Sequence, residues 1–303
     1  MKKKYLIFGG AGFLGKRLAE SFNKNIEVHI FDLEKKISKN IQKKKNFRFI
    51  NGDIRNRLTF DKIEKKKFHK VYFFSALPSV IISEKKNKLC VDTNIIGVIN
   101  FVNWAKKNKP DNIIFSSSMA VYDTVSKNVK EIDEIKPVSL YGISKVFGEN
   151  LIQTLKSKKT QVTILRLFNI YGPGQDMHNL YQGMLSIYLA QIIKTKKVYV
   201  TGSLNRFRDF VYVDDVVKAL KINFKKNNDN VFNVGSGKPT KVIKLIKIIF
   251  KLLGLKPKII EQEGHEGDTF GSYANITKIK KTGWKPKTNL IDGVKKTIKS
   301  LNL

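Results

Sequence analysis

The chain has 303 residues, 42% of them hydrophobic, which is enough for one large domain or two modest ones with a substantial core. Its single cysteine, Cys90, excludes an internal disulfide and a thiolate metal site, so we expect a reducing compartment and no metal ion. The formal net charge of +33 would suit nucleic acid, an anionic membrane or an anionic small substrate, and the distribution of the lysines has to decide among them.

The lysines recur in short runs along most of the chain, at positions where helix surfaces and loops are expected. The sequence has no basic stripe with interleaved aromatic residues, the pattern typical of nucleic-acid binding. We therefore interpret the charge as a lysine-biased composition on solvated faces and expect no nucleic-acid partner. A basic field would still favour encounter with an anionic small substrate.

The amino end imitates a signal peptide, because three lysines precede an apolar run at residues 5–8. Gly9 and Gly10 end that run before an h-region forms. No later stretch approaches the roughly 20 apolar residues that span a bilayer. The sequence therefore predicts a soluble, cytoplasmic protein that does not bind membranes.

Apolar β-rich runs alternate with helix-period segments from the amino end onward, a pattern typical of an α/β protein with a doubly wound parallel sheet. Helices are expected on both faces of that sheet. The predicted strands are residues 5–8, 27–31, 47–50, 71–74, 113–116 and 162–168, and the predicted helices are residues 13–22, 91–107 and 140–155.

After residue 174 the rhythm changes, which predicts a smaller C-terminal α/β domain. Helices are expected at residues 184–193, 213–222 and 241–253, and a strand at residues 198–200. We expect residues 1–169 to form a dinucleotide-binding domain that carries the reactive side chains. Residues 170–303 would then form a substrate-binding domain, with segments able to cross back to the first.

A glycine-rich loop, Gly9-Gly10-Ala11-Gly12-Phe13-Leu14-Gly15, follows the first strand and opens the first helix. Glycines let the backbone turn sharply and approach a pyrophosphate, while the helix N-terminus directs its N–H groups and positive dipole end at the phosphates. Asp32 ends the second strand, near the roughly 20-residue offset of the carboxylate that binds the adenosine ribose hydroxyls. An acid there repels a 2′-phosphate, so the pattern favours NAD over NADP in a Rossmann fold.

The Gly-x-x-Gly-x-x-Gly spacing of this loop resembles the extended short-chain dehydrogenase/reductase superfamily. The resemblance implies that Asp53 and Ile54, in Gly-Asp-Ile-Arg, contact the adenine. It likewise implies that Asn94 is a structural and cofactor-contacting residue. Ser75 and Ala76 follow the fourth strand, in a segment that departs from the family's usual His-Ala-Ala, and are expected to line the cofactor site.

Tyr141 and Lys145 lie four residues apart, on one face of a predicted helix. Because an unperturbed tyrosine is protonated at neutral pH, we expect the ammonium to lower the pKa of Tyr141 so that it can act as a general base. Ser118 ends the fifth strand, where ligands bind in open α/β sheets, and is positioned to bind the hydroxyl being oxidised. The family resemblance implies Ser118, Tyr141 and Lys145 as the catalytic set.

The C-terminal half resembles the nucleotide-sugar epimerase/dehydratase branch of that superfamily, through Arg-Leu-Phe-Asn-Ile-Tyr-Gly-Pro-Gly-Gln and Arg-Phe-Arg-Asp-Phe-Val-Tyr-Val-Asp-Asp. The likeness implies that Phe168 lines the nicotinamide side and that Asn169 contacts a substrate phosphate. It implies that Arg208 pairs with the substrate pyrophosphate, as a planar guanidinium suits. Phe-Asn-Val-Gly-Ser-Gly and Gly-Trp-Lys-Pro, nearer the C-terminus, are expected to be structural.

Dehydratases of this branch carry an Asp-Glu pair just after the catalytic serine or threonine, and here Met119 and Ala120 occupy those positions. We therefore expect 4-epimerisation of a nucleotide sugar, with a 4-keto intermediate and no net redox change. His265 stands where a phosphate-binding arginine is usual, close to Asp268, the expected substrate contact. Ser272 falls at a sugar-pocket position, where a small residue leaves room for an N-acetyl group.

Three functions stay open on the sequence. The leading one is a UDP-hexose or UDP-N-acetylhexosamine 4-epimerase that retains NAD. A nucleotide-sugar oxidoreductase or decarboxylase with net redox exchange is the second, and an NAD-dependent non-catalytic binding protein the third. Family likeness also implies a homodimer through the helices predicted at residues 91–107 and 140–155.

Overall fold

The computed structural model describes residues 2–33, 41, 44–63, 65, 67–122, 128–179, 183–225, 229–264 and 270–302. Its largest sheet has seven strands in the order β12-β7-β5-β4-β1-β2-β3. β1 pairs in parallel with both β2 and β4, and β4 with β5. The strands are β1 (Lys3–Phe8), β2 (Ile26–Asp32), β3 (Phe47–Asn51), β4 (Lys70–Phe73), β5 (Asn112–Ser118), β7 (Gln161–Leu167) and β12 (Val231–Val234).

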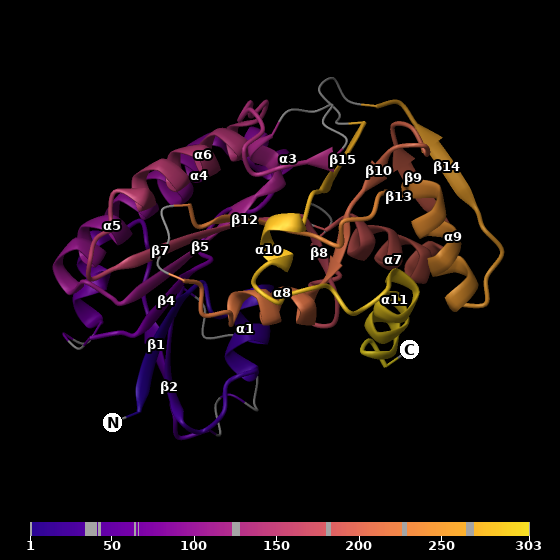
Figure 1. The fold of residues 1–303 in the computed structure, drawn as a ribbon. Helices are drawn as coiled ribbons and strands as arrows, with labels where there is room; N and C mark the ends of the chain where they lie inside the picture. Colours follow the sequence, from indigo (N-terminus) through magenta and orange to yellow (C-terminus); the bar gives the residue numbers. More distant parts are fainter. Residues whose placement is uncertain are drawn as a thin grey trace. The chain divides into compact units, whose positions relative to one another are not determined.

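Helices cover both faces of this sheet, with α5 and α6 side by side on one face and α1 on the other (Figure 1). A single turn of π-helix, η2, interrupts the helix predicted at residues 91–107. The helical elements here are α1 (Phe13–Glu20), η1 (Arg57–Lys62), α3 (Val80–Lys85), α4 (Asn87–Val91), η2 (Asp92–Ile96), α5 (Gly97–Asn108), η3 (Met119–Val121) and α6 (Leu140–Gln153). The predicted doubly wound parallel sheet is confirmed.

Aromatic side chains fill the space between the sheet and its helices. Phe8 lies at the centre, with ring centroids 4.9 Å from Phe31, 5.1 Å from Phe101 and 5.6 Å from Phe73. These rings are at most 1% exposed, and such pairs stabilise a core beyond the area that they bury. They come from three neighbouring strands and α5, so the core fixes the strand ends that surround the glycine loop.

Shorter strands and five further helices make up the rest of the described residues. Four of the strands form a sheet in the order β13-β10-β15-β6, and the others pair as β11-β8 and β14-β9. The strands are β6 (Asn128–Val129), β8 (Asn169–Tyr171), β9 (Val198–Thr201), β10 (Phe207–Arg208), β11 (Phe210–Tyr212), β13 (Thr240–Lys241), β14 (Ile259–Gln262) and β15 (Gly271–Ala274). The helices are α7 (Met184–Thr195), α8 (Val213–Leu220), α9 (Val242–Leu252), α10 (Thr277–Lys280) and α11 (Leu290–Lys299).

The helix α9 illustrates how lysine-rich segments fold in this chain. Leu245, Ile246, Ile249 and Phe250 are fully buried in one apolar cluster, at the spacing of a single helical face. The lysines of the same helix lie on its exposed side. For this helix, the high lysine content therefore belongs to a solvated face.

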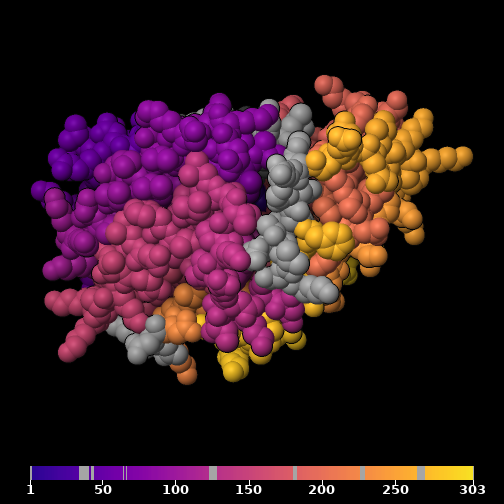
Figure 2. Space-filling view, turned by 90° about the horizontal axis from the view of Figure 1, so that it is seen from above, coloured from indigo at the N-terminus to yellow at the C-terminus, as the bar shows by residue number. Residues whose placement is uncertain are grey.

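The chain divides into two compact units, each built from separated segments. The first unit contains residues 1–121, 139–166 and 220–232, and the second contains residues 122–138, 167–219 and 233–303. Orange atoms next to the pink surface of the first unit in Figure 2 belong to its late segment at residues 220–232. Within the described ranges, no helix combines the length and apolarity needed to cross a bilayer.

Lys70 is buried at the start of β4, with 5% exposure. Its ammonium donates to the carbonyl of Ile222 and to Oδ1 of Asn223, both at 3.2 Å. Burial, with a smaller contribution from Lys3, lowers the pKa of Lys70 to about 8. Two neutral acceptors do not replace the lost hydration of the charge, so the buried ammonium destabilises the fold.

The free energy of unfolding should therefore rise with pH as Lys70 loses its proton. The pKa of Lys70 is lower in the folded protein than in the unfolded chain. The cost of burying the charge, about 3 kcal/mol, is therefore fully present below pH 8 and disappears as the pH rises towards the pKa of the unfolded chain. We expect the free energy of unfolding of Lys70→Met, relative to the parent protein, to fall between pH 7 and pH 10. The matched variant Lys107→Met, at an exposed site, should show no such trend in urea denaturation. Parallel curves for the two variants would contradict this account.

Candidate active site

The glycine loop makes a tight turn between β1 and α1. Gly9 has φ +75°, and its N–H donates to the carbonyl of Phe31 at 2.9 Å. A Cβ at Gly9 would lie 2.7 Å from the backbone N of Ser75, and one at Gly15 would overlap the carbonyl oxygen of Gly9. Glycine at these two positions thus lets the loop pack against its own backbone and against the segment after β4.

The helix α1 begins at Phe13, directly after this turn. Gly12 is its N-cap residue, and no side chain caps the first turn. A Cβ at Gly12 would meet only the carbonyl oxygen of Gly9, at 3.3 Å, so the outer side of the loop is open. An uncapped helix N-terminus behind an open glycine turn fits a pyrophosphate, because first-turn N–H groups and the helix dipole stabilise anions.

Asp32 links the ends of two strands to this loop. Its Oδ2 accepts a hydrogen bond from the N–H of Ala11 at 2.8 Å, and its carbonyl accepts one from the N–H of Gly52 at 3.0 Å. The carboxylate predicted to bind the adenosine ribose therefore already holds the glycine loop in place. The sequence did not indicate this second contact.

Asp53 follows β3 and forms an ion pair with Arg55. Nε of Arg55 lies 2.9 Å from both carboxylate oxygens of Asp53, and the N–H of Arg55 donates to Oδ1. Burial raises the pKa of Asp53, but the hydrogen bonds from Arg55 outweigh it and the pKa falls below its usual value. Ile54 is buried, and Asn100 donates to its carbonyl at 2.9 Å. This predicted adenine-contacting segment is therefore held rigidly to α5.

Asn94 lies in the π-helical turn η2 and joins two parts of the predicted site. Its Oδ1 accepts from the N–H of Leu77 at 2.7 Å, next to Ser75 and Ala76. Its Nδ2 donates to Oγ of Ser144 at 3.0 Å, and that hydroxyl donates to the carbonyl of Tyr141 at 2.7 Å. π-Helical turns often mark functional sites, and here the turn directs one amide at the segment after β4 and at α6.

Ser118 and Tyr141 meet where β5 ends. The Tyr141 hydroxyl forms a side-chain hydrogen bond with Ser118, which tends to lower its pKa. Burial is the larger effect, and it raises the pKa of Tyr141 to about 12. The structure thus brings together the two predicted residues but differs from the predicted direction of the pKa, because burial disfavours the phenolate more than its surroundings stabilise it.

Lys145 lies one helical turn beyond Tyr141 and is 5% exposed. Its Nζ donates to the carbonyl of Ser116 at 2.9 Å and lies 5.7 Å from the centre of the Tyr141 ring. Burial lowers the pKa of Lys145 to about 8, although Glu149 and Cys90 oppose this effect. The ammonium is therefore aimed at the end of β5, close to the Ser118–Tyr141 pair. A general base or acid with a shifted pKa at a strand end is typical of an active site.

The remaining predicted site residues lie in the second unit. Asn169 starts β8, and both its N–H and its Nδ2 donate to the carbonyl of Asp209, at 3.1 and 3.2 Å. Phe168 is 2% exposed, and its N–H donates to Val234. Asp268 lies outside the described residues, as does His265.

Arg208 and Ser272 are paired residues on the parallel strands β10 and β15. The guanidinium of Arg208 donates to the carbonyl of Phe207 at 2.9 Å and to that of Phe270 at 3.3 Å. Ser272 is 1% exposed. The fold therefore places the predicted pyrophosphate and sugar-pocket residues side by side, although they are 64 positions apart in the sequence.

The motif aspartates of the second unit hold loops together. Asp209 is fully buried and accepts hydrogen bonds from the backbone N–H groups of Ser236, Gly237 and Ala274, at 2.6 to 3.0 Å. Asp215 accepts from Lys287 and Thr288 and thereby holds the Gly-Trp-Lys-Pro segment. This agrees with the structural part predicted for that segment and for Phe-Asn-Val-Gly-Ser-Gly.

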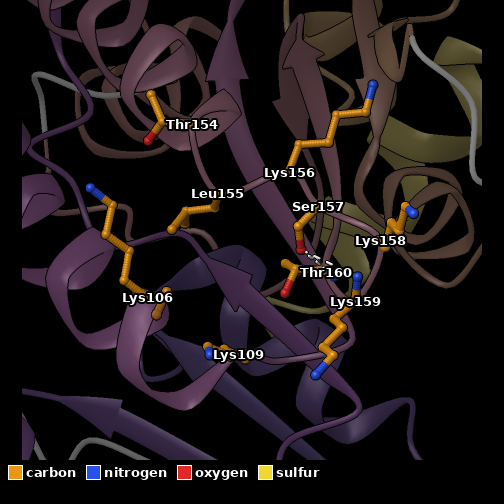
Figure 3. Close-up of a pocket in the computed structure, with 10 residues that line it drawn as sticks. Lys106, Lys109, Thr154, Leu155, Lys156, Ser157, Lys158, Lys159 and Thr160 are labelled. Atoms are coloured by element: carbon orange, nitrogen blue, oxygen red, sulfur yellow. Dashed lines mark hydrogen bonds between the residues drawn. The ribbon is translucent and has the colours of Figure 1, made fainter.

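A separate lysine-lined hollow of about 370 Å³ lies where α5 leads into β5 and α6 leads into β7. Ser118 is at the other end of β5, about 20 Å along the strand. Figure 3 shows the side chains of Lys106, Lys156 and Lys158 directed away from one another rather than towards a common point. Lysines near the C-termini of two helices complement the helix dipoles, which explains this concentration without a ligand.

Comparison with known proteins shows the family. The model of the NAD dependent epimerase/dehydratase family matches residues 5–235. This chain belongs to that family. It is 34% identical to "Putative UDP-glucose 4-epimerase" of Methanocaldococcus jannaschii, over 97% of this chain and 96% of that protein. It is 30% identical to dTDP-4-dehydro-6-deoxyglucose reductase of Escherichia coli, over 99% and 98%.

A solved structure supports the same assignment. UDP-glucose 4-epimerase of Thermotoga maritima, in a crystal structure with UDP-glucose, is 29% identical and superimposes with a TM-score of 0.89, covering 99% of this chain and 98% of that one. The predicted family is therefore confirmed, and with it NAD as the cofactor. The residues that fit NAD here are the glycine loop, Asp32 and the segment held by Asn94.

Gly15→Ala should disrupt the dinucleotide loop, because its Cβ would overlap the backbone of Gly9 and Gly10. We expect the free energy of unfolding to fall by about 1–3 kcal/mol. We also expect the purified protein to retain much less NAD. Gly264→Ala is the matched control, since its Cβ would meet Gly202 only at an ordinary 3.4 Å. Denaturant unfolding and the NAD content after dialysis measure the two effects, and equal values for both variants would refute this view of the loop.

Proposed function

We propose that the protein is an NAD-dependent nucleotide-sugar 4-epimerase that acts on a UDP-hexose or a UDP-N-acetylhexosamine. The observation that carries the proposal is the hydrogen bond between Tyr141 and Ser118 at the end of β5, with the Lys145 ammonium one helical turn away. All three residues lie in the unit that contains the glycine loop. That combination suits reversible oxidation of a secondary alcohol.

Each of these side chains would have a distinct task. As a phenolate, Tyr141 would accept the proton of the C4 hydroxyl and become a phenol, and the phenol would return that proton to the C4 oxygen at the end of the cycle. Ser118 would hydrogen-bond that oxygen and keep it beside the Tyr141 hydroxyl. Lys145 would stabilise the phenolate and bind the cofactor ribose. NAD, when bound, would supply a positive charge and would both accept and return the hydride, and because the hydride is returned the overall reaction has no net redox change.

Two residues argue against dehydration. Met119 and Ala120 directly follow Ser118 in η3, and the N–H of Ala120 donates to Oγ of Ser118 at 3.2 Å. An acid-base pair at these positions would be needed to move a proton and expel water from a sugar, and neither side chain can do so. Epimerisation needs no such pair.

Substrate binding is assigned to the second unit. Asn169 and Arg208 would bind the phosphates of the nucleotide sugar. Asp268 is a further proposed substrate contact. Ser272 would line the sugar pocket, where its small side chain accommodates an N-acetyl group. The cofactor would contact Gly9, Gly12, Phe13, Leu14 and Gly15, then Asp32, Asp53 and Ile54, Ser75 and Ala76, and finally Asn94 and Phe168.

UDP sugars are the proposed substrates because related proteins carry that chemistry in their names and titles. A net reduction is the second candidate, since one relative is named as a dTDP-4-dehydro-6-deoxyglucose reductase. We further propose a cytoplasmic homodimer that binds neither nucleic acid nor membranes and contributes to cell-surface polysaccharide synthesis. A non-catalytic NAD-binding role has no specific observation in its favour.

Tyr141→Phe should abolish most of the epimerase activity, because it removes the acid-base hydroxyl but keeps the ring. We expect kcat to fall by about 10²–10⁴-fold. The assay incubates purified protein with a panel of UDP sugars, without added cofactor, and identifies the products. Tyr199→Phe, a partly exposed tyrosine in β9, is the matched control and should keep full activity.

Absorbance at the NADH band separates epimerisation from the alternatives. Epimerisation predicts product formation without NADH released or consumed. Stoichiometric NADH turnover with the sugar would overturn the proposal in favour of a net oxidoreductase or decarboxylase. Unchanged turnover in Tyr141→Phe would instead remove the assigned acid-base group.

A further inference from the structure

A buried ion pair lies next to the proposed catalytic helix face. Glu149 on α6 and Arg166 on β7 are joined by two hydrogen bonds, Nε to Oε1 at 2.9 Å and Nη2 to Oε2 at 2.7 Å. Their side chains are only 6% and 4% exposed. Planar, bidentate geometry of this kind fixes the direction of the carboxylate as well as its position.

Glu149 lies four residues after Lys145 and therefore on the same face of α6. Both residues are buried in the first unit, with whole-residue exposures of 4% for Glu149 and 5% for Lys145. Within the described part of the chain, the Lys145 ammonium donates to the neutral carbonyl of Ser116 alone, and the Phe115 ring lies 5.2 Å away. A carbonyl and an aromatic face replace only part of the hydration that an ammonium loses on burial.

We propose that Glu149, fixed by Arg166, is a positioning residue for the reaction: its buried carboxylate stabilises the ammonium of Lys145 beside Tyr141. Glu149 touches neither reacting group in the proposed mechanism and acts through Lys145. Arg166 has two effects, because it compensates the burial of Glu149 and prevents the carboxylate from turning away. The role of Glu149 in the reaction rests on the proposed function, whereas its electrostatic effect on Lys145 does not.

The other ionisable groups near Lys145 do not replace Glu149. Tyr141 lies on the same helix and is neutral, since its pKa is raised to about 12. Cys90 on α4 interacts with Lys145, but burial raises the pKa of its thiol. Glu84 on α3 acts on Cys90, and its carboxylate accepts a hydrogen bond from the N–H of Leu140. Glu149 is therefore the carboxylate that favours the charged lysine.

The direct test measures the titration of Lys145 by NMR in protein labelled with ¹³C at lysine Cε. The signal is assigned by its absence in Lys145→Met, and the parent midpoint is expected at about 8. In Glu149→Gln the midpoint should fall by about one pH unit or more, because a favourable charge is lost and the Arg166 cation is left uncompensated. In the double variant Glu149→Gln/Arg166→Gln it should fall less, since both charges are gone.

Asp215→Asn is the matched control, because it removes another buried carboxylate that pairs with a lysine and with backbone N–H groups, in the second unit. It should lower the melting temperature without moving the Lys145 midpoint. The double variant also keeps the test valid if Glu149→Gln alone fails to fold. An unchanged midpoint in the folded Glu149 variants would overturn the proposal and leave the pair a purely structural role.

Activity provides an independent second readout. The alkaline limb of the pH dependence of kcat/KM should move to lower pH in Glu149→Gln, in parallel with the NMR midpoint. If the midpoint shifts in Glu149→Gln but the parent protein shows no epimerase activity, the proposed function is refuted and the electrostatic inference stands. A shifted midpoint with an unmoved pH profile in an active enzyme would refute the positioning of Lys145 for the reaction.

Discussion

The close contact between α6 and β5 is the constraint on which the proposed active site depends. A Cβ at Gly148 would lie 2.6 Å from Cζ of Phe115, so glycine lets the helix approach the strand directly. At this separation the Lys145 ammonium reaches the carbonyl of Ser116, and the Tyr141 hydroxyl reaches Ser118. A larger residue at position 148 would move the helix and separate both pairs, so the chemistry depends on packing that lies outside the reacting groups.

The same site depends on contacts that bind loops to one another. Asp32 joins the glycine loop to the end of β2, and Asn94 joins the segment after β4 to Ser144 on α6. Both side chains were predicted to bind the cofactor, and both already satisfy backbone N–H groups. A polar side chain that structural hydrogen bonds already hold in place fixes the geometry before a ligand arrives, which lowers the ordering cost of binding.

Much of the first unit could be predicted, because its information is local. Hydrophobic runs predicted six of the seven strands of the large sheet to within a few residues and missed β12, and the motifs singled out Gly9, Asp32, Ser118, Tyr141 and Lys145 as candidate site residues. The pairing of Arg208 with Ser272 and the π-helical turn at Asn94 depend on contacts between distant segments, which periodicity does not encode. The direction of the pKa of Tyr141 was wrong for the same reason, since burial comes from the whole fold and the sequence shows only the nearby lysine.

A shifted pKa alone would not have located this site. Burial lowers the pKa of Lys70 and of Lys145 to the same value of about 8. Lys70 begins β4 and donates to a backbone carbonyl and to a side-chain amide oxygen, whereas Lys145 reaches the end of β5 beside a tyrosine and a serine. Both lysines are 5% exposed, but the carboxylate of Glu149 opposes the effect of burial on the pKa of Lys145, whereas Lys3 adds to the effect of burial on the pKa of Lys70. Two features distinguish a reactive lysine from a merely buried one: it lies at the carboxyl end of a parallel strand, and it has an acid-base group beside it.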